Sequence, residues 1–266
     1  MKIAIVGCGN MGMAFARSFV QYDLVKKEDL LLIEKSRERS EVLRSQKEGV
    51  VVDTIGEAVG GNDLVILSVK PQDFAAVAAE LRSFLQPEQV VLSIMAGIPL
   101  AKIQAALNHS QVVRAMPNTP AMLGQGITGY CAAEGISFQK LQRIDNLINA
   151  TGRSVYLENE ELLDAVTALS GSGPAYFYYL VKHMVEAGTK MGFDEGLSRL
   201  LVKQTMLGSY HLINNAEQSL DELIAAVASK GGTTEAALKT FGERQLGDSL
   251  IEGILKAEAR AKELSK

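Results

Sequence analysis

A glycine-rich loop directly after an apolar run restricts the fold of this chain more than any other feature. The run Ile3–Val6 is followed by Gly7-x-Gly9-x-x-Gly12 and then by an apolar pattern at helical spacing. The first glycine permits a sharp turn, the second lets the backbone approach a pyrophosphate, and the third lets the helix pack on the strand. The N–H groups at the helix start then face the phosphates. The sequence therefore predicts a dinucleotide site, with a plain turn as the alternative.

The end of the second apolar run, Asp29–Glu34, gives a mixed signal about the adenosine end of the cofactor. Glu34 stands 22 positions after the third glycine, where an acid would hold the ribose 2′-hydroxyl of NADH. Lys35, Ser36 and Arg37 follow at once and are suited to the 2′-phosphate of NADPH. A solvated helix start is a third interpretation, and the residues alone leave all three open.

Further apolar runs alternate with helical patterns and predict a mostly parallel sheet. Ligands of such sheets bind beyond the carboxyl ends of the strands. The sequence thus predicts an α/β fold whose Rossmann-type dinucleotide-binding domain covers residues 1–160. The expected later strands are Val50–Val52, Asp63–Val69, Gln89–Ser93, Gln111–Met116, Ile127–Ala132 and Ser154–Leu157, and Phe138–Ala150 is an expected helix.

The segments that follow the strands are the predicted cofactor contacts. Two prolines bracket Asn118 in a stiff loop, and rigid polar loops at strand ends often line sites. Pro71 also suits the first turn of a helix, which is its alternative interpretation. The complete set of predicted cofactor-binding residues is Val6, Gly7, Gly9, Asn10, Met11, Gly12, Lys35, Ser36, Ser68, Val69, Lys70, Pro71, Met95, Ala96, Gly97 and Asn118.

Beyond residue 160 the pattern changes entirely to helices. The segment Asp194–Asn214 carries apolar residues around much of its circumference, so it should be buried on more than one side. A small helical domain can hardly bury such a helix alone, which favours burial against a second subunit. The charged stretch Leu250–Leu264 fits a solvated or subunit-facing helix. Residues 161–266 are therefore predicted to form an all-α dimerisation domain.

The stretch Ser229-x-Gly231–Gly232–Thr233–Thr234 again places glycines and hydroxyls at a helix start. Backbone N–H groups at such a start form an anion site suited to a carboxylate. Taken alone, an ordinary capped helix is the simpler interpretation.

Composition excludes several classes of protein. The formal net charge of −4, with Lys and Arg scattered among acids, argues against a nucleic-acid partner. No segment has the length and apolarity of a membrane span. Cys8 and Cys131 cannot form a disulfide framework, and Met1 leads directly into the first strand with no room for a signal peptide, so we expect a cytoplasmic protein. The histidines lack metal-ligand spacing, so no metal is expected, and Cys8 fits a small packing residue better than a nucleophile.

Five stretches together resemble the pyrroline-5-carboxylate reductase family in their order and separation. The resemblance covers essentially the whole chain, and its last motif is the most specific. Lys230 stands where the family usually has proline, and Glu34 is more acidic than expected of a strictly NADPH-using member. The stretches are Gly7–Gly12, Val69–Gln72, Arg114–Pro120, Ser170–Tyr176 and Ser229–Thr234.

The resemblance implies reduction of pyrroline-5-carboxylate to L-proline with NADPH, or with NADH as a second option. The substrate would lie between the nicotinamide and Ser229–Thr234 of the partner subunit, and dimers would combine into a larger homo-oligomer. Thr234 would be the catalytic residue, through a hydrogen bond to the ring nitrogen. The residues implied to bind the substrate are Ser229, Gly231, Gly232, Thr233 and Thr234.

Two alternatives stand beside this interpretation. A related imine or β-hydroxyacid reductase would carry a lysine acid on a helix of the second domain, and Lys182 and Lys190 are available for that role. A non-catalytic NADP(H)-binding sensor would signal through the dimer interface and would need no carboxylate pocket. The Gly–Gly–Thr–Thr turn argues against both.

Overall fold

The computed structural model describes residues 1–265 and divides into two compact units. The first unit comprises Met1–Ser172 together with the chain from Ala257 onward, and the second is Gly173–Lys256. The first unit extends past the predicted boundary at residue 160 because the next helical turns pack on the sheet: Leu163 is fully buried in its core, and Val166 packs against the same cluster.

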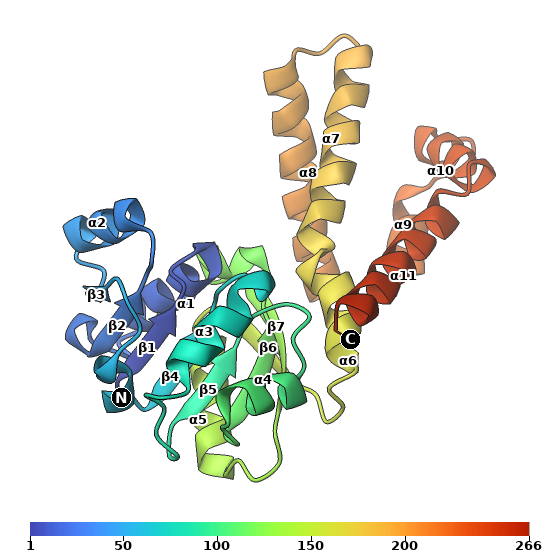
Figure 1. The fold of residues 1–266 in the computed structure, drawn as a ribbon. Helices are drawn as coiled ribbons and strands as arrows, with labels where there is room; N and C mark the ends of the chain where they lie inside the picture. Colours follow the sequence, from blue (N-terminus) through green and yellow to red (C-terminus); the bar gives the residue numbers. More distant parts are fainter. Residues whose placement is uncertain (266) are drawn as a thin grey trace. The chain divides into compact units, whose positions relative to one another are not determined.

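One sheet forms the centre of the first unit, with strand order β3-β2-β1-β4-β5-β6-β7-β8 (Figure 1). Every neighbouring pair is parallel except β6 and β7, which confirms the predicted mostly parallel sheet. The order diverges on either side of β1, so the loop after β1 lies at the switch point where open α/β sheets bind ligands. The strands are β1 (Ile3–Val6), β2 (Leu30–Ile33), β3 (Val50–Val52), β4 (Leu64–Leu67), β5 (Val90–Ser93), β6 (Val112–Met116), β7 (Gly126–Ala132) and β8 (Gly152–Tyr156).

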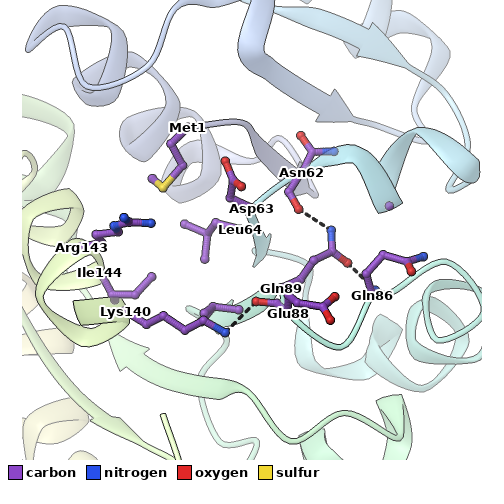
Figure 2. Close-up of a pocket in the computed structure, with 12 residues that line it drawn as sticks. Met1, Asn62, Asp63, Leu64, Gln86, Glu88, Gln89, Lys140, Arg143 and Ile144 are labelled. Carbon is purple, nitrogen blue, oxygen red and sulfur yellow. Dashed lines mark hydrogen bonds between the residues drawn. The ribbon is translucent and has the colours of Figure 1, made fainter. Parts of the chain in front are cut away.

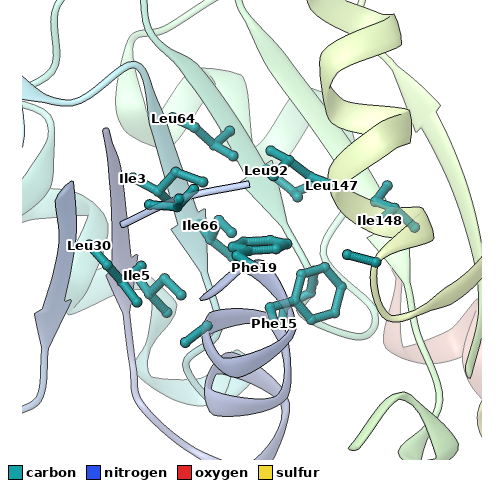
Figure 3. Close-up of a cluster of buried hydrophobic side chains, with 14 of the residues drawn as sticks. Ile3, Ile5, Phe15, Phe19, Leu30, Leu64, Ile66, Leu92, Leu147 and Ile148 are labelled. Carbon is teal, nitrogen blue, oxygen red and sulfur yellow. The ribbon is translucent and has the colours of Figure 1, made fainter. Parts of the chain in front are cut away.

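Helices cover both faces of this sheet, which is why β1, β2 and β4 are apolar at every position. One face packs against α1 (Asn10–Gln21) and α5 (Phe138–Asn149). There Phe15 and Phe19 meet edge to face at 5.8 Å among the aliphatic side chains of the strands (Figure 3). The other face packs against α3 (Phe74–Leu81) and α4 (Leu100–Leu107).

Shorter helical elements connect these layers. The helix α6 (Leu162–Val166) continues through a π-helical turn, Thr167–Gly171, directly into the first helix of the second unit. A π-helical turn of this kind often occurs at a functional site. The remaining elements of the first unit are α2 (Arg37–Gln46) and the 3-10 helices Lys27–Asp29, Glu57–Gly61, Pro71–Asp73 and Thr119–Leu123.

The second unit is helical, as predicted. Its first two helices lie side by side as a hairpin (Figure 1). The last helix begins at Leu246, four residues earlier than expected, because Gln245 adopts a left-handed conformation (φ 53°) that turns the chain directly into it. The helices are α7 (Gly173–Lys190), α8 (Glu195–Asn215), α9 (Leu220–Val227), α10 (Thr233–Glu243) and α11 (Leu246–Leu264), the last of which ends in the first unit.

Helix α8 leaves large apolar side chains uncovered in the single chain. Leu200 is 64% exposed and Leu212 66% exposed, and Leu207 and Tyr210 are also exposed. A helix that is apolar on several sides is normally buried. Among residues 1–265, α7 and α8 included, no helix is both long enough and apolar enough to cross a membrane.

Close packing between α7 and α8 depends on a glycine. A Cβ atom at Gly188 would lie 2.6 Å from Ser198 Oγ and 2.9 Å from Ser198 Cβ. We expect Gly188→Val to lower the free energy of unfolding by about 1–3 kcal/mol, the usual cost of overpacking. Ser198→Ala is the control, because its buried hydroxyl has no hydrogen-bond partner among the described residues and its loss should cost nothing. Thermal unfolding of both variants checks this, and equal melting temperatures would contradict it.

Candidate functional site

The three glycines of the loop after β1 occupy three different environments. Gly7 has a φ of 91°, and a Cβ there would lie 2.8 Å from Ser68 O. A Cβ at Gly12 would overlap the carbonyl oxygen of Gly7, whereas a Cβ at Gly9 would meet nothing within 4 Å. The fold therefore requires glycine at the first and third positions. At the second position it leaves open space, which is what the approach of a ligand requires.

The start of α1 faces this open space with unsatisfied donors. Gly9 is the N-cap residue, and no side chain caps the helix. The N–H groups of Asn10, Met11 and Gly12 lie in the first turn, where a helix offers them no partner. Backbone donors at such a position, reinforced by the helix dipole, bind phosphate. The loop therefore fits the pyrophosphate of a dinucleotide.

A cavity of about 630 Å³ lies beside the loop at the carboxyl ends of the strands. It has room for one nucleotide half of a dinucleotide cofactor. Several residues predicted from separate parts of the sequence come together in its lining, namely Val6, Gly7, Gly9, Lys35, Ser68, Val69 and Lys70. Glu34 lines it too.

The other predicted cofactor residues lie outside this lining, and their role in cofactor binding stays a prediction. Pro71 begins a 3-10 helix, as its alternative interpretation expects. Met95 is buried, and its N–H donates to Ser93 Oγ at 3.3 Å. Gly97 has a φ of 71°, and a Cβ there would lie 3.3 Å from the carbonyl oxygen of Leu264 near the chain end. The rest of this group are Ser36, Ala96, Asn118 and the first-turn residues Asn10, Met11 and Gly12.

The side chain of Asn118 already has two protein partners. Its Nδ2 donates to the carbonyl oxygen of Ser170 at 3.2 Å, and its Oδ1 accepts the N–H of Ile127 at 3.0 Å. Ser170 belongs to the π-helical turn, so this amide ties the loop after β6 to that turn and to β7. The sequence pattern indicated a rigid loop here but not this bridging role.

A buried ion network that sequence reasoning missed lies beneath the same loop. The guanidinium of Arg114, which is only 4% exposed, contacts Glu160 Oε1 at 2.8 Å and Asp164 Oδ1 at 3.3 Å. Ser265 Oγ donates to the same Asp164 oxygen at 2.8 Å. The network joins β6, α6 and the end of the chain. An arginine inside an otherwise apolar strand was the signal that could have revealed it.

Cys8 lies inside the glycine loop as a buried, neutral thiol. Burial, and after it the neighbouring Glu34 carboxylate, raise the pKa of the Cys8 thiol to about 12. A thiol with such a pKa is a poor nucleophile near neutral pH. This agrees with its interpretation as a packing residue.

The predicted substrate turn lies at the start of α10. Gly231 has a φ of 75°, its N–H donates to Glu235 Oε2 at 2.7 Å, and the N–H of Gly232 donates to Ser229 O at 2.9 Å. No side chain caps the helix at Gly232. The N–H groups of Thr233 and Thr234, in the first helical turn, are therefore the donors that remain for an anion.

A separate polar pocket lies at the opposite, amino ends of β4 and β5 (Figure 2). Its lining residues hold connecting loops together. Gln89 Nε2 donates to Asn62 O at 2.6 Å, Gln89 Oε1 accepts the N–H of Gln86 at 2.7 Å, and Lys140 Nζ donates to Glu88 O at 2.7 Å. This pocket lies away from the glycine loop and is not the cofactor site.

A Rossmann-type sheet, an open glycine loop at its switch point and an appended helical unit define a dinucleotide-dependent oxidoreductase. Family models agree: residues 2–97 match "NADP oxidoreductase coenzyme F420-dependent" and residues 160–264 match "Pyrroline-5-carboxylate reductase dimerisation". Pyrroline-5-carboxylate reductase of Pseudomonas aeruginosa is 38% identical across the whole chain and 97% of its own length. The chain belongs to the pyrroline-5-carboxylate reductase family.

Solved structures of the same family share the fold over the whole chain. The enzyme from Coxiella burnetii has a TM-score of 0.89 at 29% identity, with 98% of its chain covered. The pyrroline carboxylate reductase of Plasmodium falciparum, solved with NADP bound, has a TM-score of 0.90 at 25% identity, also with 98% of its chain covered. These matches confirm the Rossmann-type domain followed by a helical dimerisation domain.

Proposed function

We propose that this protein reduces 1-pyrroline-5-carboxylate to L-proline with NADPH, the last step of proline biosynthesis, and accepts NADH as well. The observation that carries the proposal is the full-length match, at 38% identity, to a reductase of that name. The open Gly9 position supports the cofactor, since it leaves space where the pyrophosphate must approach the backbone. Purified protein given pyrroline-5-carboxylate should oxidise NADPH, and a preparation that never does so refutes the proposal.

The reaction does not require a strongly acidic group from the protein. When bound, NADPH supplies a hydride to the C=N carbon of the cyclic imine. The imine nitrogen is basic enough to be protonated near neutral pH, so no strong protein acid is needed. The chain's contribution is then mainly orientation and exclusion of water, which lower a barrier by about 7–11 kcal/mol in favourable intramolecular cases.

Different residues of the chain bind the cofactor and the substrate. The cofactor is held by Val6, Gly7, Gly9–Gly12, Ser68–Pro71, Met95–Gly97 and Asn118, and its 2′-phosphate is attracted by Lys35 and Ser36. Ser229 and Gly231–Thr233 bind the substrate carboxylate, chiefly through the N–H of Thr233, because the N–H groups of both glycines have internal partners. Thr234 hydrogen-bonds the ring nitrogen.

The proposal also covers the oligomeric state, the partners and the cellular location of the enzyme. The dimers combine into a larger homo-oligomer, for which the resemblance to the family is the support. A net charge of −4 supports the absence of a nucleic-acid partner. A biosynthetic reductase that draws on NADPH fits the cytoplasm.

Thr234→Ala tests the placement of the substrate. We expect imine reduction to slow by roughly two- to tenfold, the value of one neutral hydrogen bond, while NADPH affinity stays nearly intact. A larger loss would indicate proton donation, which typically contributes about 10²–10⁴-fold. Steady-state kinetics with both substrates varied, on variants shown to be folded and dimeric, separate these cases.

Thr233→Ala is the matched control, because it removes the neighbouring hydroxyl and keeps the backbone N–H group. It should retain most of the activity. If turnover and the KM for the imine are both unchanged in Thr234→Ala, Thr234 is only part of a helix start and the proposed substrate placement is wrong.

A further inference from the structure

The carboxylate of Glu34 is fixed in place at the end of β2. Its Oε2 accepts the N–H of Cys8 at 3.2 Å, and its Oε1 accepts the N–H of Ser36 at 2.9 Å. The residue is only 9% exposed, yet it lines the cavity beside the glycine loop. A carboxylate has about four acceptor sites. Two N–H bonds therefore orient Glu34 and leave acceptor capacity for a ligand in the cavity.

Three cations of this region, Lys35, Arg39 and Arg44, are already engaged with protein groups. Lys35 Nζ lies 3.6 Å from Asp73 Oδ1, and Arg44 Nη2 lies 2.8 Å from Asp53 Oδ1. Arg39 Nε donates to the carbonyl oxygen of Cys8 and lies 3.9 Å from Glu34 Oε2. A 2′-phosphate entering here would have to compete with carboxylates for these cations.

The cavity as a whole carries more acid than base. Its ionisable lining consists of four carboxylates and two lysines, namely Glu34, Asp53, Asp73, Glu80, Lys35 and Lys70. Of the four carboxylates, Glu34 directly contacts the glycine loop, through the N–H of Cys8. It is therefore the acid best placed to meet the adenosine ribose of a dinucleotide whose pyrophosphate lies on that loop.

We infer that Glu34 sets the choice between NADPH and NADH, by presenting a fixed carboxylate that accepts the ribose hydroxyls of NADH and repels the 2′-phosphate of NADPH. The inference rests on the proposed function, since it takes dinucleotide binding as given. Lys35 and Ser36 act in the opposite direction, and the balance leaves the adenosine end open to both cofactors.

Direct binding measurements on Glu34→Gln test this inference without any imine. The Kd values for NADPH and NADH are measured by titration of the nicotinamide fluorescence of each cofactor. Loss of the negative charge should strengthen NADPH binding by about tenfold relative to NADH. The change should shrink as salt is added, because added ions screen the repulsion between the carboxylate and the 2′-phosphate.

Two further variants separate charge from other effects. Glu34→Asp keeps the charge, so its ratio of NADPH to NADH affinity should stay close to that of the wild type even if both cofactors bind less well. Glu80→Gln removes a carboxylate from the same cavity on α3 and should leave the ratio unchanged.

The outcomes are distinct. An unchanged ratio in Glu34→Gln, or an equal change in Glu80→Gln, overturns the role of Glu34 and leaves the proposed function standing. Wild-type protein that binds neither dinucleotide overturns both. Weaker binding of both cofactors by the same factor in Glu34→Gln and Glu34→Asp would mean that Glu34 only positions the loop, which also contradicts the inference.

Discussion

Gly9→Val should fold normally and lose about 100-fold or more in NADPH affinity. The fold tolerates a side chain at this position, because a Cβ there meets nothing within 4 Å. The cofactor does not, since the valine methyl groups would stand where the pyrophosphate approaches the backbone. Titration of NADPH fluorescence gives the affinity, and the melting temperature without cofactor, expected to match the wild type, shows that the fold is intact.

Gly61→Val is the matched control for this substitution. Gly61 also has nothing within 4 Å of its would-be Cβ, but it ends the 3-10 helix Glu57–Gly61, which lies before the amino end of β4. This variant should bind NADPH like the wild type. A folded Gly9→Val protein with unchanged NADPH affinity would remove the basis for a dinucleotide site at this loop.

Leu200→Glu should convert the dimer to monomers and abolish most of the imine reduction. Leu200 is 64% exposed in the single chain and lies on α8, within the matched dimerisation domain. An unpaired carboxylate in an apolar interface carries a large desolvation cost. Activity should fall with the dimer, because the proposed substrate turn is contributed by the partner subunit.

Sedimentation at micromolar concentration measures this effect directly. Lys203→Glu is the control, since it places the same charge on α8 at a position that is already charged. It should remain dimeric. A wild-type protein that sediments as a monomer, or a Leu200→Glu variant that stays dimeric and active, would contradict the assignment of α8 to the interface.

The sequence predicts the sheet well, and also the edge of the sheet where the cofactor is proposed to bind, because both depend on local patterns. Apolar runs such as Ile3–Val6 form the strands at nearly their expected bounds, and parallel strands bring their carboxyl ends to one edge. Residues as distant as Gly9 and Lys70 therefore meet in one cavity. The exposed apolar surface of α8 was predictable for the same reason, since helical spacing alone shows that it is apolar on several sides.

Contacts of side chains with residues far away in the sequence could not be predicted. Arg114 meets an acid 50 positions later, and Asn118 meets a carbonyl 52 positions later. The role of Glu34 was left open because an acid, a lysine and a serine follow one another at the end of β2. Only the orientation of the carboxylate, set by two N–H groups from different loops, favours one interpretation.

Transfer of deuterium from the cofactor to the product is the direct test of the proposed imine reduction. Purified protein is incubated with pyrroline-5-carboxylate and NADPH deuterated at both positions of nicotinamide C4, and the product is analysed by mass spectrometry and NMR. We expect L-proline with a single deuterium, on the carbon that was doubly bonded to nitrogen. Proline without deuterium, or cofactor binding with no proline formed, would contradict it.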